Sequence, residues 1–153
     1  MLSVESILSP RRTLCGAPGV SKKRVLEHIA NVICADQTQF NSRHIFDALI
    51  AREKLGSTAL GSGIAIPHCR LNRCNNCYGT LITLADDGVD FDAIDNNPVD
   101  LLFVLLVPEA ANEEHLQILA ELARLFSDAD YCARLRAAED ADALYSAAIK
   151  YGQ

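Results

Sequence analysis

Residues 99–107 read VDLLFVLLV, a nearly unbroken apolar run that is ended by Pro108. A run of this kind is typical of a central β-strand covered on both faces, whereas a strand at the edge of a hairpin alternates apolar and polar residues. The run therefore predicts a sheet with other elements packed against both of its sides.

The sequence on either side of this run predicts further strands and helices. Upstream, residues 64–66 form a short apolar strand closed by Pro67, and residues 78–84 are rich in β-forming residues. Downstream, Asn112 caps a helix, and Asp128 and Asp140 cap two shorter ones. The residues of the first helix that are expected to face inward are Leu116, Leu119, Leu122 and Phe126.

The N-terminal part of the chain predicts a short arm and two helices. Residues 1–20 contain two prolines and two glycines, which indicates a short strand or arm followed by a loop. Ser21 caps a helix that runs to about residue 35, and Ser42 opens a second helix that stops at Gly56. Helices first, strands in the middle and helices last predict a single α/β or α+β domain over residues 1–153.

Composition disfavours several classes of function. The 153 residues include 20 acidic and 14 basic ones, and the net charge of −6 disfavours nucleic acid or an anionic membrane as the main partner. No run approaches the ~18 consecutive apolar residues that a membrane-spanning helix needs. Arg11 and Arg12 interrupt the position where an export signal would be apolar. We therefore expect a cytoplasmic protein, without membrane insertion, whose six cysteines are reduced.

The densest cluster of unusual residues is 52–70, REKLGSTALGSGIAIPHCR. The spacing from Gly56 to Gly61 is that of a P-loop, but Ser62 stands where the P-loop lysine is needed. The GSG sequence from Gly61 begins a dinucleotide fingerprint, but Ile66 occupies its third glycine position. Nucleotide binding by either motif is therefore disfavoured.

The end of this segment predicts a phosphoryl acceptor. Pro67 restrains the backbone, so that the imidazole of His68 would project from the end of a rigid strand. Arg52 supplies a bidentate donor for the oxygens of a phosphoryl group, whose transfer needs chiefly positioning and charge stabilisation. No metal or cofactor is required if the phosphoryl donor is also a histidine. The other candidate phosphate-binding residues are Ser57, Thr58, Gly61 and Gly63.

From Arg52 to His68 the chain resembles the phosphorylation-site signature of the fructose/mannitol/nitrogen class of enzyme IIA domains of the bacterial phosphotransferase system. Residues 91–108, FDAIDNNPVDLLFVLLVP, and residues 135–145, LRAAEDADALY, resemble its nitrogen-regulatory branch. The resemblance covers the chain from about residue 21 to residue 151. It implies a mixed sheet of about five strands flanked by helices.

The resemblance also implies a function for three side chains. His68 would be phosphorylated on Nε2 by an HPr-type carrier that bears the phosphoryl group on its own histidine. Arg52 and His115 match the family's other active-site residues, and His115 would donate a hydrogen bond to the phosphoryl group. The expected output is regulation of partner proteins according to the phosphorylation state of His68. A sugar-specific enzyme IIA that passes its phosphate to the IIB component of a permease is the nearest alternative.

One region departs from the family pattern and supports an alternative of another class. Cys69 stands where the family commonly has glycine, which puts in doubt how the donor approaches. With Cys74 and Cys77 beside His68, it offers soft ligands for a zinc or redox sensor, although a second well-spaced pair is missing. A hydrolase that uses a serine with His68 is disfavoured, because the chain has no GxSxG motif.

Overall fold

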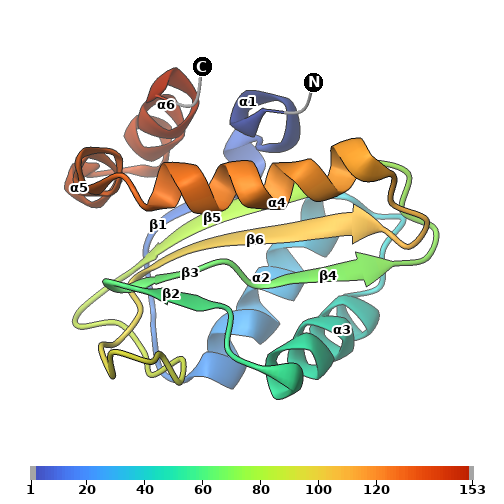
Figure 1. Ribbon diagram of the computed structural model, residues 1–153, viewed down its shortest axis with the longest axis horizontal. Coiled ribbons are helices and arrows are strands. Elements are labelled where there is room, and N and C mark those ends of the chain that lie inside the picture. Colours follow the sequence, from blue (N-terminus) through green and yellow to red (C-terminus); the bar gives the residue numbers. More distant parts are fainter. Residues whose placement is uncertain (1–2, 152–153) are drawn as a thin grey trace.

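The computed structural model describes residues 3–151, which form one mixed β-sheet between two layers of helices (Figure 1). The strands lie in the order β1-β5-β6-β3-β2, and β4 also pairs with β6. The β5–β6 and β2–β3 pairs are antiparallel, whereas β1–β5, β3–β6 and β4–β6 are parallel. This arrangement confirms the predicted fold class. The strands are β1 (Thr13–Ala17), β2 (Ala59–Gly61), β3 (Ile64–Ala65), β4 (His68–Leu71), β5 (Tyr78–Leu84) and β6 (Leu101–Pro108).

Strand β6 is the centre of the sheet, as its apolar sequence predicts. All eight of its residues are buried. Phe103 and Leu105 pack into the core on one face of the sheet, and Leu102 and Val104 pack into the core on the other. Because burying one such side chain is worth about 2 kcal/mol, β6 is stable only with both faces covered.

Two groups of helices supply this cover (Figure 1). Helices α2 and α3 lie against one face of the sheet, and α1, α4, α5 and α6 lie on the other. The helices are α1 (Val4–Ile7), η1 (Pro10–Arg12), α2 (Lys22–Asp36), α3 (Ser42–Leu55), α4 (Glu113–Phe126), α5 (Ala129–Ala137) and α6 (Ala141–Tyr151).

Polar side chains cap the N-terminal ends of several helices. Ser21, Asn112 and Asp128 each accept a hydrogen bond from a backbone N–H of the first turn of their helix, which confirms the predicted caps. Helix α3 differs by one residue, because its cap is Asn41 and Ser42 is already helical. A predicted boundary that moves by one residue leaves the inner face of the helix unchanged.

The N-terminal segment has more helix than the sequence indicates. Val4 and Ile7 of the one-turn helix α1 are buried, and Ser3 and Ser6 cap it through reciprocal hydrogen bonds. After η1, β1 adds a parallel strand next to β5, where the sequence predicts a short strand or arm. Residues 1 and 2 of that arm lie outside the described residues. One helical turn is too short to give a periodic pattern, so the sequence does not reveal it.

Pro67 divides one sheet position between two strands. Ile64 and Ala65 of β3 pair with the beginning of β6, and His68–Leu71 of β4 pair with its end. The proline has no N–H to donate, so pairing is interrupted there, although its carbonyl accepts a hydrogen bond from the Leu105 N–H at 2.9 Å. The expected five strand positions are therefore present, with β3 and β4 sharing one. His68 begins a strand rather than ending one, which the sequence does not predict.

The turn between β2 and β3 fixes the approach of the chain to this position. Gly63 has φ +80°, and a Cβ there would lie 2.8 Å from Nη2 of Arg136 and 2.9 Å from Oδ1 of Asp100. Nη2 of Arg136 donates a hydrogen bond to Oδ1 of Asp100 at 2.9 Å and another to the Ser62 carbonyl at 2.8 Å. The turn therefore needs a glycine both for its backbone conformation and for the close approach of α5.

We expect Gly63→Ala to lower the free energy of unfolding by about 2 kcal/mol or more, since it adds a steric clash to an unfavourable left-handed backbone. Gly16→Ala is the matched control, because Gly16 has φ +68° but no atom within 4 Å of an added Cβ. This control should lose only about 1 kcal/mol. Urea unfolding of both variants measures the difference, and equal losses would show that the Arg136 contact does not constrain the turn.

Candidate functional site

A pocket of about 650 Å³ opens at the edge of the sheet, beside strand β4. β6 pairs with one side of β4, and no described strand pairs with the other. Residues of α3 and α4 line the pocket. These two helices belong to opposite helix layers (Figure 1). The pocket brings together the three residues predicted to be catalytic. Its lining consists of Ala48, Ala51, Arg52, Leu55, His68, Cys69, Arg70, Leu105, Val107, His115, Leu116 and Leu119.

The alternation of β4 decides which of its side chains share a face. Successive side chains of a strand point to opposite faces, so His68 and Arg70 lie on one face and Cys69 on the other. His68 is in register with Leu105 and Arg70 with Val107, and both partners belong to the core cluster on the α4 side. Strand β4 therefore presents an imidazole and a guanidinium on its α4 side.

A hydrogen bond fixes the tautomer of His68. Its Nδ1 lies 2.8 Å from the carbonyl oxygen of Ile66. A carbonyl oxygen can only accept, so Nδ1 carries the proton and donates it, and Nε2 of the neutral ring keeps its lone pair. The side chain is half-buried. The ring is thus held with its nucleophilic nitrogen free of a proton.

Arg52 lies against that nitrogen. It stands in the last turn of α3, and its Nε–H donates to Nε2 of His68 at 3.3 Å. Its Nη1 donates to the carbonyl of Gly56 at 2.8 Å, which holds the guanidinium over the end of the helix. No acidic partner is within ion-pair distance of Arg52 among the described residues. Its positive charge is therefore available to an anion bound at His68.

His115 has the opposite tautomer. It is the third residue of α4, and the backbone N–H of Asn112 donates to its Nδ1 at 3.3 Å. A backbone N–H can only donate, so Nδ1 carries the lone pair, and Nε2 of the neutral ring carries the proton. The positive end of the α4 dipole lies at the same place. His115 therefore brings a hydrogen-bond donor to the pocket in which His68 presents an acceptor.

The four predicted phosphate-binding residues do not line this pocket. The Ser57 hydroxyl donates to the carbonyl of Phe91, and the Thr58 hydroxyl donates to the buried carboxylate of Glu53. Both hydroxyl protons are therefore engaged elsewhere. Gly61 ends β2 and Gly63 lies in the turn that follows, and the hydrogen bonds of the His68 ring go to Arg52 and Ile66 instead of to any of these four residues.

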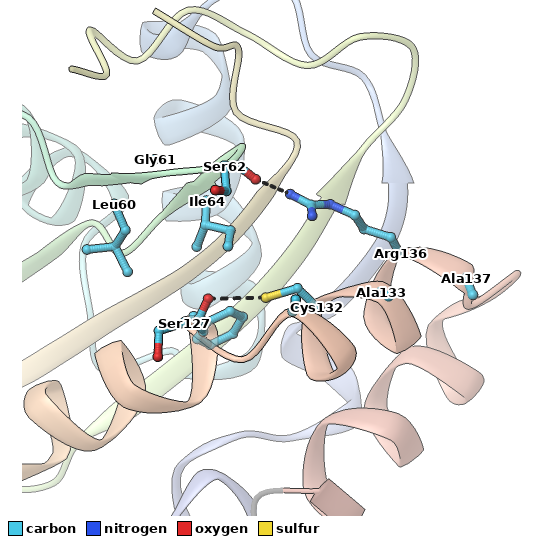
Figure 2. Close-up of a pocket in the computed structure, with 11 residues that line it drawn as sticks. Leu60, Gly61, Ser62, Ile64, Ser127, Cys132, Ala133, Arg136 and Ala137 are labelled. Carbon is cyan, nitrogen blue, oxygen red and sulfur yellow. Dashed lines mark hydrogen bonds between the residues drawn. The ribbon is translucent and has the colours of Figure 1, made fainter. Parts of the chain in front are cut away.

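A second pocket, of about 680 Å³, lies beside that turn (Figure 2). Gly61 and Ser62 border it from the sheet, and Cys132 and Arg136 border it from α5. The thiol of Cys132 donates to the carbonyl of Phe126, and Arg136 is bound to the Ser62 carbonyl and to a carboxylate. Although this pocket is slightly larger, its thiol and its guanidinium already have partners within the protein. We therefore place the chemistry at His68.

Several residues of the histidine pocket are not apparent from sequence reasoning. Arg70 is exposed and faces the same side as His68, a fact that depends on the undetected strand β4. Leu55 is 85% exposed and Leu116 is 45% exposed, and both form an apolar rim. The prediction that Leu116 faces inward is wrong, because the first turn of α4 extends over the pocket instead of the core. An i, i+2 count from His68 would have drawn attention to Arg70.

Comparisons with known proteins agree on one family. The family described as "Phosphoenolpyruvate-dependent sugar phosphotransferase system, EIIA 2" matches residues 6–150. A nitrogen regulatory protein of Pseudomonas aeruginosa is 54% identical over 149 residues, which are 97% of this chain and 96% of that protein.

Solved structures show the same relationship. The nitrogen regulatory protein IIA-Ntr of Neisseria meningitidis superimposes with a TM-score of 0.84 and 37% identity, over 94% of this chain and 97% of that one. The mannitol IIA protein of Escherichia coli has a TM-score of 0.71 over 91% and 96% of the two chains, and at 19% identity it shows the fold alone. No helix within residues 3–151 has the length and apolar character that crossing a membrane requires.

The cysteines near His68 do not form a ligand set. Cys69 and Cys74 belong to the core cluster on the α2 and α3 side of the sheet, whereas Cys77 belongs to the cluster on the other side. Within the described part of the chain, no three His, Cys, Asp or Glu side chains are grouped so that they could hold a metal ion. Burial, with a further contribution from the nearby Cys74, raises the pKa of Cys69 to about 12. Zinc and redox chemistry both use the thiolate, so the structure gives the sensor alternative no support.

The raised pKa of Cys69 predicts that this thiol is inert in the folded protein. At pH 8 only about one in 10,000 such groups is a thiolate, and burial also blocks access. Iodoacetamide should therefore leave Cys69 unmodified in the folded protein and alkylate all six cysteines in urea. Mass spectrometry of peptides after digestion measures both results. Rapid alkylation of Cys69 without denaturant would contradict the burial described above.

Proposed function

Because the chain belongs to the type-2 EIIA family of the phosphotransferase system, we propose that it accepts a phosphoryl group on Nε2 of His68. The donor is an HPr-type carrier phosphorylated on its own histidine. The output is regulation of partner proteins, which follows the similarity to nitrogen regulatory proteins. The observation that carries the proposal is the pair of opposite tautomers, an acceptor on His68 and a donor on His115, in one pocket.

The proposed transfer requires neither a metal ion nor a change in the protonation of His68. The lone pair of Nε2 attacks phosphorus, a new N–P bond forms, and the N–P bond of the donor breaks. The electron pair of the broken bond returns to the donor's imidazole. The proton on Nδ1 of His68 stays in its hydrogen bond to Ile66, where it stabilises the positive charge that develops on the phosphorylated ring.

Charge stabilisation comes from three directions. Arg52 turns from Nε2 of His68 to the phosphoryl oxygens as the N–P bond forms, which keeps its guanidinium within reach of the new anion. His115 donates from Nε2 at the N-terminal end of α4. Arg70 adds a second guanidinium on the same side of β4. Such donors act on the equatorial oxygens, where a loose transition state concentrates its charge.

Phosphorylation changes the surface that partners meet. Before it, the pocket is a neutral imidazole pair with two arginines and an apolar rim at Leu55 and Leu116. Afterwards it carries roughly two additional negative charges. A partner that docks on the rim therefore distinguishes the two forms by electrostatics and desolvation. A regulatory protein and a sugar-specific enzyme IIA share this first step and differ in whether an enzyme IIB partner then takes the phosphate.

Incubation with a phosphorylated HPr-type carrier should add one acid-labile phosphate per chain, and His68→Ala should abolish it. His115→Ala and Arg52→Lys should each slow the transfer by about 100-fold, since each removes a donor that the transition state needs. Radiolabelled phosphate on the intact protein measures the rates. His28→Ala is the control, because His28 is exposed on α2 and should leave the rate unchanged.

Undiminished labelling of His68→Ala would overturn the assignment of the acceptor. Addition of an enzyme IIB domain to the phosphorylated protein then separates the two outputs. Retention of the phosphate supports the regulatory role, whereas its rapid loss to the IIB domain would show that the protein is a sugar-specific carrier.

A further inference from the structure

A buried carboxylate lies one residue after Arg52 and is not used by the mechanism above. Glu53 is 8% exposed, although it stands in the last turn of α3, where the helix dipole disfavours a negative charge. Lys22, at the start of α2, forms an ion pair with Oε1 of Glu53 at 2.9 Å. A buried charge at the unfavourable end of a helix needs several partners, and the contacts of this one point toward the active site.

The other partner of Glu53 is Thr58, just beyond the end of the helix. The backbone N–H of Thr58 donates to Oε1 at 3.2 Å, and its hydroxyl donates to Oε2. Thr58 is itself only 6% exposed. One carboxylate thus binds both the main chain and the side chain of Thr58, and so fixes the loop between Glu53 and Thr58. That loop contains Gly56, whose carbonyl accepts the hydrogen bond from Arg52.

From Thr58 the hydrogen bonds continue to the catalytic ring. The carbonyl of Thr58 accepts from the N–H of Ile66 at 3.1 Å. The carbonyl of Ile66 accepts from Nδ1 of His68 at 2.8 Å. The N–H of Ile66 and its carbonyl lie in the two peptides that flank its Cα, so the bond to Thr58 restrains Ile66 on its N-terminal side. Pro67, which follows, has no N–H that could hold the second peptide. The carboxylate of Glu53 is therefore linked to the Nδ1 proton through two backbone carbonyls.

We propose that Glu53 and Thr58 are positioning residues for phosphoryl transfer: they hold the Ile66 carbonyl where it keeps the proton of His68 on Nδ1. The inference rests on the proposed function for its kinetic consequence alone. Loss of the Glu53–Thr58 contact lets the Ile66 carbonyl shift, the ring then populates the Nε2–H tautomer, and that tautomer has no lone pair with which to attack phosphorus. Groups that orient the histidine ligands of metal sites typically change metal affinity or activity by about 10- to 100-fold when removed, and we expect an effect of that order here.

Thr58→Val tests this, because valine keeps the shape of threonine and removes the hydroxyl. We expect the Nδ1–H form of His68 to lose population, and the rate of phosphate uptake to fall about 10-fold. Nitrogen-15 shifts of the labelled histidine rings report the tautomer at about pH 8.5, where imidazole is neutral. Thr58→Ser restores the hydroxyl and should restore both the tautomer and the rate.

Two further variants separate positioning from general stability. Thr13→Val removes another buried threonine hydroxyl, which donates to the Ser9 carbonyl at 2.9 Å in the strand farthest from the site, and it should change neither readout. Glu53→Gln keeps the size of the side chain and should shift the tautomer as Thr58→Val does, which provides a second route if that variant folds poorly.

An unchanged tautomer in both site variants, or an equal loss of rate in Thr13→Val, would overturn the proposal. If the wild-type protein takes up no phosphate, the proposed function fails, while the nitrogen-15 comparison still decides whether this pair positions the ring.

Discussion

The burial of β6 on both faces is the constraint from which the position of the site follows. A strand with apolar side chains on both sides needs helices above and below it, and two of those helices, α3 and α4, contribute side chains to the pocket beside the neighbouring strand β4. Since β4 has no described partner on its outer side, a gap remains there between the two helix layers. The imidazole of His68 lies in that gap. The macromolecular donor proposed above can reach it at the sheet edge, whereas a site inside the sandwich would be closed to such a donor.

Within the gap, backbone geometry gives the two histidines different chemistry. His68 follows a proline that interrupts strand pairing, which leaves the Ile66 carbonyl free to accept from the ring. His115 is in the first turn of a helix, where backbone N–H groups lack helical partners and one of them donates to the ring. The same side chain thus presents a lone pair on Nε2 at one place and a proton on Nε2 at the other. Neither role requires a buried carboxylate in contact with the imidazole.

The sequence predicts the parts of this structure that have strong local signals. The run at 99–107 identifies the central strand, and Ser21, Asn112 and Asp128 mark helix starts, because these patterns depend on burial and capping within a few residues. Strand β4 is missed because HCRL resembles a loop until β6 pairs with it. Arg70 is missed with it.

The predictions for phosphate-binding residues show a second limit. Ser57 and Thr58 have suitable hydroxyl groups, but their partners, the Phe91 carbonyl and Glu53, are determined by tertiary packing.

Arg52 shows why residue type alone cannot define such a site. Its Nε–H donates to Nε2 of His68, so the proposed transfer requires the guanidinium to leave that nitrogen as phosphorus approaches. The Gly56 carbonyl retains the other arm of the fork at 2.8 Å, and the group can therefore pivot instead of departing. In the transfer proposed above, an arginine held in this way covers Nε2 of His68 beforehand and faces the phosphoryl oxygens afterwards, whereas a flexible lysine at the same position would be held less firmly.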